Sequence, residues 1–197
     1  MVYKIFEMGL IRKTWNFIWH DDSMLSWVVN VILALVLVKF VIYPGLGFIF
    51  ATTHPLVAVV SGSMEHNNLA FDQWWDERGQ WYTDDGITKE EFLEFPLKNG
   101  FSRGDIMVLV GVNELSIGDV IVFRKDNGGS PPIIHRLVKN GEVLQSKGDN
   151  NLGIHEFEKN IRKDMIIGKA VLRAPYLGYV KIIFVDYLWN PIKSVLL

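Results

Sequence analysis

One long apolar run near the N-terminus constrains this chain of 197 residues more than any other feature. From Leu25 to Phe50 the sequence reads LSWVVNVILALVLVKFVIYPGLGFIF, and Lys39 is its only charged residue. About 20 apolar residues in a helix cross the hydrocarbon core of a bilayer, and a lysine can extend its ammonium group to the interface. The run predicts a transmembrane anchor over residues 25–50. A buried helix of a soluble protein is the less favoured interpretation, and the run is too long for a cleaved signal peptide.

The basic residues around the run predict its orientation in the membrane. Three of them precede it, and after Lys39 none occurs before Arg78. Because positively charged flanks remain in the cytoplasm, we expect residues 1–24 to be cytoplasmic and the chain beyond the anchor to lie outside. The protein is therefore predicted in the cell membrane, with its main domain on the extracytoplasmic face. The three preceding residues are Lys4, Arg12 and Lys13.

Beyond the anchor, the pattern of residues 51–176 predicts a mainly β domain. Short runs rich in β-branched residues are separated by clusters of Gly, Asn, Asp and Pro, which is typical of strands joined by turns. Many short strands at close spacing indicate a folded or closed antiparallel unit. The runs lie at residues 56–60, 103–111, 117–124, 131–138, 141–149 and 165–172.

Residues 66–100 interrupt the β pattern with an insert rich in Trp, Asp and Glu. The insert holds eight acidic residues against three basic ones, a balance of −5, which indicates a solvated surface. Within it, Thr88 is followed three residues later by Glu91. This spacing is that of a capping box and predicts one short helix.

The C-terminal residues 177–197 are apolar again, but Lys181, Asp186 and Lys193 interrupt them. A full membrane span would bury several of these charges. A short helical segment associated with the membrane surface fits better, and a second transmembrane helix is the alternative.

Charge and cysteine content exclude several functions. The net charge of −2 provides no positive field to attract nucleic acid. Without cysteine, the chain cannot form disulfides, thiolate nucleophiles or cysteine-ligated zinc sites. We expect neither a metal nor a cofactor.

The chemistry is predicted to lie directly after the first strand-like run, where VAVVSGSM places Ser61 and Ser63 on either side of a glycine. A serine hydroxyl is a weak nucleophile unless a base removes its proton. Ser63 can attack a carbonyl while its own backbone N–H, or the Ser61 hydroxyl, faces the developing oxyanion. Taken alone, however, Ser-Gly-Ser is common in turns.

Four histidines follow the anchor, and His135 in the strand-like run IIHRLV is the candidate base. A lone histidine in a strand is more often a core residue with a polar partner, so its combination with Ser63 carries the argument. An acid in a polar loop would orient the imidazole, and the segment KGDNNLGIHEFE offers Asp149 and Glu156 for that role. Asp149 also suits a turn.

Five segments in this order, SGSM after an anchor, GDVIVF, IIHRLV, KGDNN and IIGKAVLRAPYLGYV, make the chain resemble type I signal peptidase. Histidine in the IIHR segment, where the bacterial branch has a lysine, resembles the archaeal and endoplasmic-reticulum branch. The resemblance runs from about Val31 to the C-terminus, apart from the insert. Each motif alone is weak, whereas five in register are highly specific.

The resemblance implies a role for each matching residue. Ser63 matches the family nucleophile, His135 the general base, and Ser61 a residue that helps to form the oxyanion hole. Asp149 lies in the family's GDNN box, and the family's usual triad aspartate follows shortly after that box. This chain has no aspartate at that spacing. With one inserted residue the position is Glu156, so we expect Glu156 to orient the base and Asp149 to support it.

The resemblance also implies substrates and partners. Precursors bearing signal peptides would be cut after small side chains close to the outer membrane surface, with membrane lipid and the secretion translocon as further partners. An extended peptide can add as a strand beside Leu56, Val57 and Val59. His66 stands where the family usually has proline and, being close to Ser63 in sequence, is a less favoured rival for the base.

Two other functions stay open. A membrane-tethered peptidase related to the self-cleaving repressor proteases would use a lysine base, and His135 would then be dispensable. A non-catalytic, membrane-anchored β domain would instead bind a partner through the acidic insert, residues 66–100.

Overall fold

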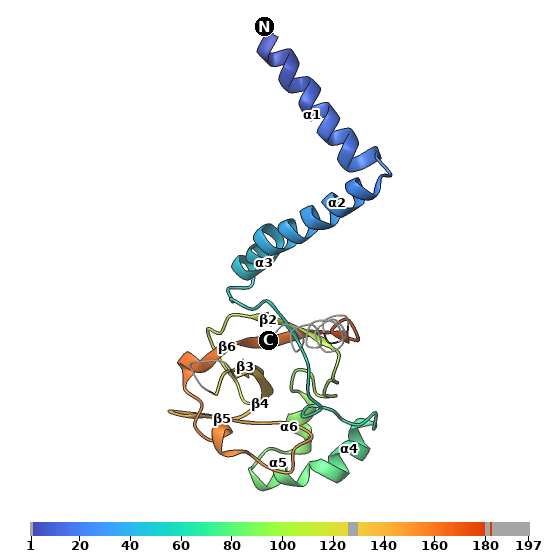
Figure 1. The fold of residues 1–197 in the computed structure, drawn as a ribbon. Helices are drawn as coiled ribbons and strands as arrows, with labels where there is room; N and C mark the ends of the chain where they lie inside the picture. The colour runs from blue at the N-terminus through green and yellow to red at the C-terminus, as the bar shows by residue number, and fades with distance from the viewer. Residues whose placement is uncertain (1, 126–129, 180–181, 183–197) are drawn as a thin grey trace, which may run out of the picture. The chain divides into compact units, whose positions relative to one another are not determined.

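The computed structural model describes residues 2–125, 130–179 and 182. The chain divides into two compact units, Met1–Ile49 and Phe50–Leu197. Figure 1 shows the helices of the first unit and the sheet of the second.

The first unit is helical apart from a short break at residues 21–23. Helix α1 (Val2–His20) is followed by α2 (Met24–Leu37), a π-helical turn η1 (Val38–Ile42) and α3 (Tyr43–Ile49). The π turn ends two residues before Pro44, and a proline lacks the N–H that an α-helical hydrogen bond needs. The sequence did not predict α1.

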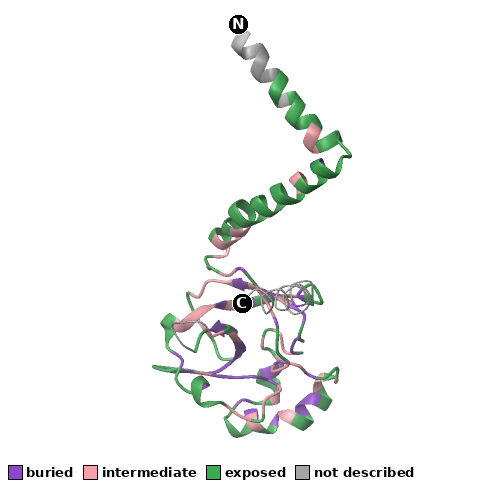
Figure 2. Ribbon diagram, viewed as in Figure 1, coloured by how far each residue is buried: buried purple, intermediate pink, exposed green. Residues whose placement is uncertain are grey.

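The continuous helix Met24–Ile49 has the length and composition of the predicted anchor. It is 26 residues long, an 18-residue window within it has a mean hydropathy of 2.5, and it is the one helix in the described chain long and apolar enough to cross a membrane. Ser23 caps its N-terminus, since the Ser23 hydroxyl accepts a hydrogen bond from the Ser26 N–H at 3.2 Å. Most of its side chains are exposed (Figure 2), as suits a helix surrounded by lipid.

The second unit is built on one antiparallel sheet of six strands, so the prediction of a mainly β domain is confirmed. The strand order is β1-β2-β6-β3-β4-β5, and every neighbouring pair runs antiparallel. All six strands lie in the runs predicted from the sequence or extend them by at most two residues. Their bounds are β1 Leu56–Ala58, β2 Ile106–Val110, β3 Val120–Phe123, β4 Ile133–Asn140, β5 Leu144–Lys147 and β6 Ile166–Ala174.

The sheet wraps around its core, and β3 is buried on both faces. Val120 and Val122 pack in one hydrophobic cluster with residues of β2 and β4, whereas Ile121 and Phe123 pack in a second cluster with Leu137 and Leu144. This double burial explains why the β3 sequence VIVF is continuously apolar rather than alternating.

The insert contains three short helices with their own aromatic core. The capping box predicted at Thr88 and Glu91 is present at the start of the third helix. Six buried residues form the core, five from the insert and one from β4: Trp74, Trp75, Tyr82, Ile87, Phe92 and Val138. The three helices are α4 Phe71–Arg78, α5 Gln80–Asp84 and α6 Lys89–Leu93. The insert is therefore a packed part of the β domain, with its acidic residues around an apolar interior.

Most of the C-terminal segment, residues 177–197, lies outside the described residues. Whether it rests on the membrane or spans it therefore stays a prediction, as do the cytoplasmic and extracytoplasmic assignments of the chain.

Candidate active site

The turn that carries Ser63 is anchored in the core on both sides. Val59 and Met64 are both 1% exposed and belong to the same hydrophobic cluster. The Val59 N–H donates to the Asp105 carbonyl at 2.9 Å, and the Phe101 N–H donates to the Met64 carbonyl at 3.0 Å. Between these two anchors Ser63 is left half-buried. The turn is thus held firmly while its hydroxyl remains accessible.

The structure brings Ser63 and His135 together although 72 residues separate them. His135 is buried in the middle of β4, and its Nε2 lies 2.9 Å from Ser63 Oγ. The Ser61 hydroxyl lies 3.2 Å from Ser63 Oγ, so the two serines of the motif contact each other. An imidazole nitrogen and a second hydroxyl therefore both lie within hydrogen-bond distance of the Ser63 hydroxyl.

Glu158, which the sequence analysis missed, is the carboxylate that contacts His135. Its Oε1 lies 2.5 Å from His135 Nδ1 and accepts the Ser146 hydroxyl at 3.2 Å, while its Oε2 accepts the His155 N–H at 2.9 Å. Burial raises the pKa of Glu158, but the hydrogen bonds from His135, His155 and Ser146 outweigh this effect and lower that pKa below its ordinary value. The carboxylate is therefore held in its charged form.

Glu156, the expected orienting acid, lies elsewhere. It is exposed and forms an ion pair with Lys159 at 2.5 Å. The short 3-10 helix η2 (Glu156–Glu158) places Glu156 outward and Glu158 inward. A signal for Glu158 was available, because it stands three residues after His155 and closes a capping-box bond to the His155 N–H.

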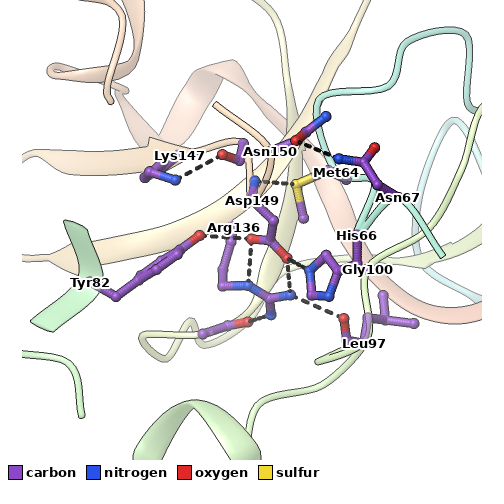
Figure 3. Close-up of polar contacts among 12 residues, drawn as sticks. Met64, His66, Asn67, Tyr82, Leu97, Gly100, Arg136, Lys147, Asp149 and Asn150 are labelled. Atoms are coloured by element: carbon purple, nitrogen blue, oxygen red, sulfur yellow. Dashed lines mark hydrogen bonds and ion pairs between the residues drawn. The ribbon is translucent and has the colours of Figure 1, made fainter. Parts of the chain in front are cut away.

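Asp149 is buried at the centre of a separate polar cluster (Figure 3). Arg136 binds both of its oxygens, from Nε at 2.9 Å and from Nη2 at 2.7 Å. The Tyr82 hydroxyl donates to Oδ1 at 2.8 Å, and His66 Nε2 lies 3.2 Å from Oδ2. Burial raises the pKa of Asp149, but the Arg136 charge and these hydrogen bonds hold that pKa far below its ordinary value. His66 thus contacts Asp149, and His135 is the histidine against Ser63.

The segment after β5 joins this cluster to the Ser63 turn. The Asn150 N–H donates to the Ser63 carbonyl at 2.8 Å, and the Asn150 side chain donates to the Gly62 carbonyl at 3.1 Å. Gly148 fits closely against both Ser63 and His135, because a Cβ there would lie 2.8 Å from the Ser63 carbonyl oxygen and 2.9 Å from His135 Nε2. A side chain at position 148 would therefore push Ser63 and His135 apart.

A groove with a volume of about 420 Å³ opens beside Ser63 and His135. Residues on both sides of it come from the β1 region and from β4, and they include Val57, Val60 and Ile133. Of the three residues expected to meet substrate, only Val57 lines the groove. Leu56 is 38% exposed and does not line the groove, and Val59 lies in the core. Phe157, which lies between Glu156 and Glu158, adds an apolar side chain to the wall.

Within residues 2–125, 130–179 and 182, no group of three or more His, Asp or Glu side chains is arranged to hold a metal ion. The site consists of three side chains beside the groove. The Ser63 hydroxyl contacts the His135 imidazole, which contacts the buried Glu158 carboxylate. This is the geometry used by serine hydrolases of the Ser-His-acid type.

Comparison with known proteins gives the family. No family model matches the chain. It is 30% identical over 164 residues to signal peptidase complex catalytic subunit SEC11 of Colletotrichum graminicola, covering 76% of this chain and 75% of that protein. It is 30% identical over 172 residues to the SEC11 subunit of Fusarium vanettenii, covering 80% and 78%, and 29% identical over 159 residues to the human subunit SEC11C, covering 74% and 65%. The chain belongs to the family of signal peptidase catalytic subunits, as its motifs predicted.

Proposed function

We propose that this chain is the catalytic subunit of a signal peptidase complex: a membrane-bound serine endopeptidase that removes N-terminal signal peptides from secreted precursors after small side chains. The observation that carries the proposal is the 2.9 Å contact between Ser63 Oγ and His135 Nε2, with the buried Glu158 on the other nitrogen. The relatives, named as catalytic subunits, support the same activity.

In the proposed reaction, His135 removes the proton from the Ser63 hydroxyl as Oγ attacks the scissile carbonyl. The imidazolium that forms then gives this proton to the leaving amine, which releases the mature protein and leaves the signal peptide as an ester on Ser63. His135 next takes a proton from water, the hydroxide attacks the ester, and the proton returns to Ser63. Glu158 keeps the imidazole in the required tautomer and stabilises its charged form.

The Ser61 hydroxyl and the backbone N–H of Ser63 are the proposed oxyanion donors. Ser61 Oγ lies 3.2 Å from the attacking oxygen and comes from an exposed position at the edge of the groove. Donors fixed in advance stabilise the charge that develops on the carbonyl oxygen.

The substrate is proposed to bind as an extended strand along β1. This strand is at an edge of the sheet, so its outer backbone groups are available for pairing with a peptide. Val57 and Val60 would contact alternate side chains of the peptide, in place of the Leu56 and Val59 contacts expected from the sequence. Asp149 is proposed to hold the segment that contacts the Ser63 turn rather than to act on His135.

The proposed setting follows from the anchor. Other subunits of a signal peptidase complex and precursor proteins are the main partners, and membrane lipid and the secretion translocon are further ones. The three basic residues before the anchor favour an N-terminus in the cytoplasm and the β domain on the opposite side.

The test is cleavage of a precursor by the full chain in its detergent-solubilised membrane complex, compared with Ser63→Ala in the same complex. Wild type should produce the mature protein, and the variant should not. If neither protein cleaves, the non-catalytic alternative gains support. A lysine-base enzyme would instead keep its activity in His135→Ala.

A further inference from the structure

The second helix of the insert lies against the segment that holds the Ser63 turn. Tyr82 of α5 is fully buried, and its hydroxyl donates to Asp149 Oδ1 at 2.8 Å. The same ring lies 4.6 Å from the ammonium group of Lys147, and the neighbouring Trp81 ring lies 5.2 Å from it. Two residues of α5 therefore contact two positions of the 147–150 segment, and Figure 3 shows the bond from Tyr82 to Asp149.

The beginning of the insert contacts the same carboxylate from another direction. His66 Nε2 lies 3.2 Å from Asp149 Oδ2, and the His66 ring stacks on Trp74 of α4 at 3.7 Å and an interplanar angle of 3°. Trp74 and Tyr82 belong to one aromatic core, with their ring centroids 6.2 Å apart. Both contacts on Asp149 are thus backed by the packed interior of the insert.

Asp149 is linked through neighbouring residues to both Ser63 and His135. The next residue, Asn150, donates its N–H to the Ser63 carbonyl at 2.8 Å. Arg136 donates two hydrogen bonds to Asp149, and it directly follows His135 in β4. A small movement of Asp149 therefore changes the distance between Ser63 and His135, and misplacement of about 1 Å is costly for catalysis.

We propose that the insert, residues 66–100, is a support for the catalytic loop and that Tyr82 is its positioning residue. The proposal rests on the proposed peptidase function and assigns the insert a part in that reaction. Tyr82 fixes Asp149 through its hydroxyl and covers Lys147 with its ring, so the 147–150 segment keeps Ser63 in line with His135. The insert was expected to be a solvated acidic surface, whereas its buried aromatic side performs this task.

The first experiment measures precursor cleavage by Tyr82→Phe in the full-chain complex. The variant keeps the buried ring and loses the hydroxyl that meets a charged carboxylate. We expect kcat to fall about tenfold, the size of effect typical of a hydrogen bond to a charged group, with KM within about twofold because the groove is untouched. Combined with Asp149→Asn, Tyr82→Phe should add less than about twofold, since its effect passes through Asp149.

The matched control is Tyr176→Phe, which removes a hydroxyl from a tyrosine that is 72% exposed. It should cleave like wild type. Thermal unfolding of each variant shows whether the protein is fully folded at the assay temperature, so that a lower kcat is not a loss of folded enzyme.

The second experiment does not depend on activity. Hydrogen–deuterium exchange of the 147–151 segment should be about tenfold faster in Tyr82→Phe than in wild type or Tyr176→Phe, because the Asn150 N–H would be less firmly held against Ser63. Unchanged exchange together with unchanged kcat would overturn the proposal. Faster exchange in a protein that never cleaves the precursor would retain the support role and overturn only the peptidase function.

Discussion

The described residues of the β domain include two histidine–carboxylate pairs, of which one faces the Ser63 hydroxyl. His135 Nδ1 lies 2.5 Å from Glu158 Oε1, and His66 Nε2 lies 3.2 Å from Asp149 Oδ2. All four side chains are buried. The far nitrogen of His135 meets Ser63 Oγ, whereas the far nitrogen of His66 is buried with no hydrogen-bond partner among the described residues.

The carboxylates also differ in what neutralises them. Asp149 is bound by the Arg136 guanidinium at both oxygens, so its charge is already compensated. Besides His135, the other hydrogen-bond donors to Glu158 among the described residues are neutral, namely the Ser146 hydroxyl and a backbone N–H. Its charge therefore remains available to stabilise an imidazolium. On the proposed function, these two differences suit the His135 pair, rather than the His66 pair, to act on Ser63.

The largest expected effect separates the two histidines. His135→Gln should lower turnover by about 10⁵-fold or more, because the base is lost and the triad acts as a unit. His66→Gln should stay within about tenfold of wild type, because the amide can still donate to Asp149. Turnover of a precursor by both variants checks this, and equal losses would erase the distinction between the pairs.

The next effect separates two glutamates that are two positions apart. Glu158→Gln should lower kcat by about 10³–10⁴-fold, because the neutral amide no longer stabilises the imidazolium or selects its tautomer. Glu156→Gln is the matched control and should change kcat by less than about twofold, since that side chain is exposed beside Lys159. Single-turnover cleavage rates decide the matter. A dead Glu156→Gln enzyme with an active Glu158→Gln enzyme would restore the assignment made from the sequence.

The third effect concerns stability more than rate. Asp149→Asn leaves the Arg136 guanidinium buried without its counter-ion, which should lower the free energy of unfolding by about 3–5 kcal/mol. Glu158→Gln should cost only about 1–2 kcal/mol, because its other partners are neutral. Denaturant unfolding of both variants measures the difference. The reverse order would mean that the Glu158 pair is the structural one.

The smallest expected effect concerns Lys147, whose ammonium group interacts with the charges of Asp149 and Glu158. Burial lowers the pKa of Lys147 to about 8 from its ordinary value of 10.5, although the charges of Asp149 and Glu158 act to raise it. Between these two pH values the unfolded chain holds the proton that the folded protein has released, so the free energy of unfolding rises with pH. Relative to Lys147→Met, wild type should gain on the order of 2 kcal/mol between pH 7 and pH 10.5.

Urea unfolding at several pH values measures this gain, with Lys139→Met as the control at an exposed position of the neighbouring strand. That control should show no rise specific to this pH range. A difference between wild type and Lys147→Met that does not vary with pH would mean that Lys147 carries the same charge in the folded and unfolded states.

Local patterns in the sequence determined a large part of this protein. The anchor follows from length and apolarity alone, and the helix Met24–Ile49 agrees with residues 25–50 to within one residue at each end. The strands follow from β-branched runs between turn residues, and the capping box at Thr88 from a spacing of three. Each of these signals lies within a few residues of what it predicts, so no knowledge of the fold was needed.

The order of side chains around the site was decided by the tertiary structure. Glu156 and Glu158 are the same residue type in one short segment, and a single 3-10 turn selects which of them reaches His135. Likewise, Val57 lines the groove whereas Leu56, one residue earlier in the same strand, does not.

The contacts between Asp149 and the insert could not be predicted from the sequence either, because they join residues that are far apart in the chain. The bonds of Asp149 to Arg136, Tyr82 and His66 join positions 13, 67 and 83 residues away. Composition identified the insert as acidic, which is true of its residues. It did not predict that the aromatic side chains of the insert would pack against the loop that holds Ser63. Contacts between distant segments depend on how the whole sheet folds, and no local pattern in the sequence encodes them.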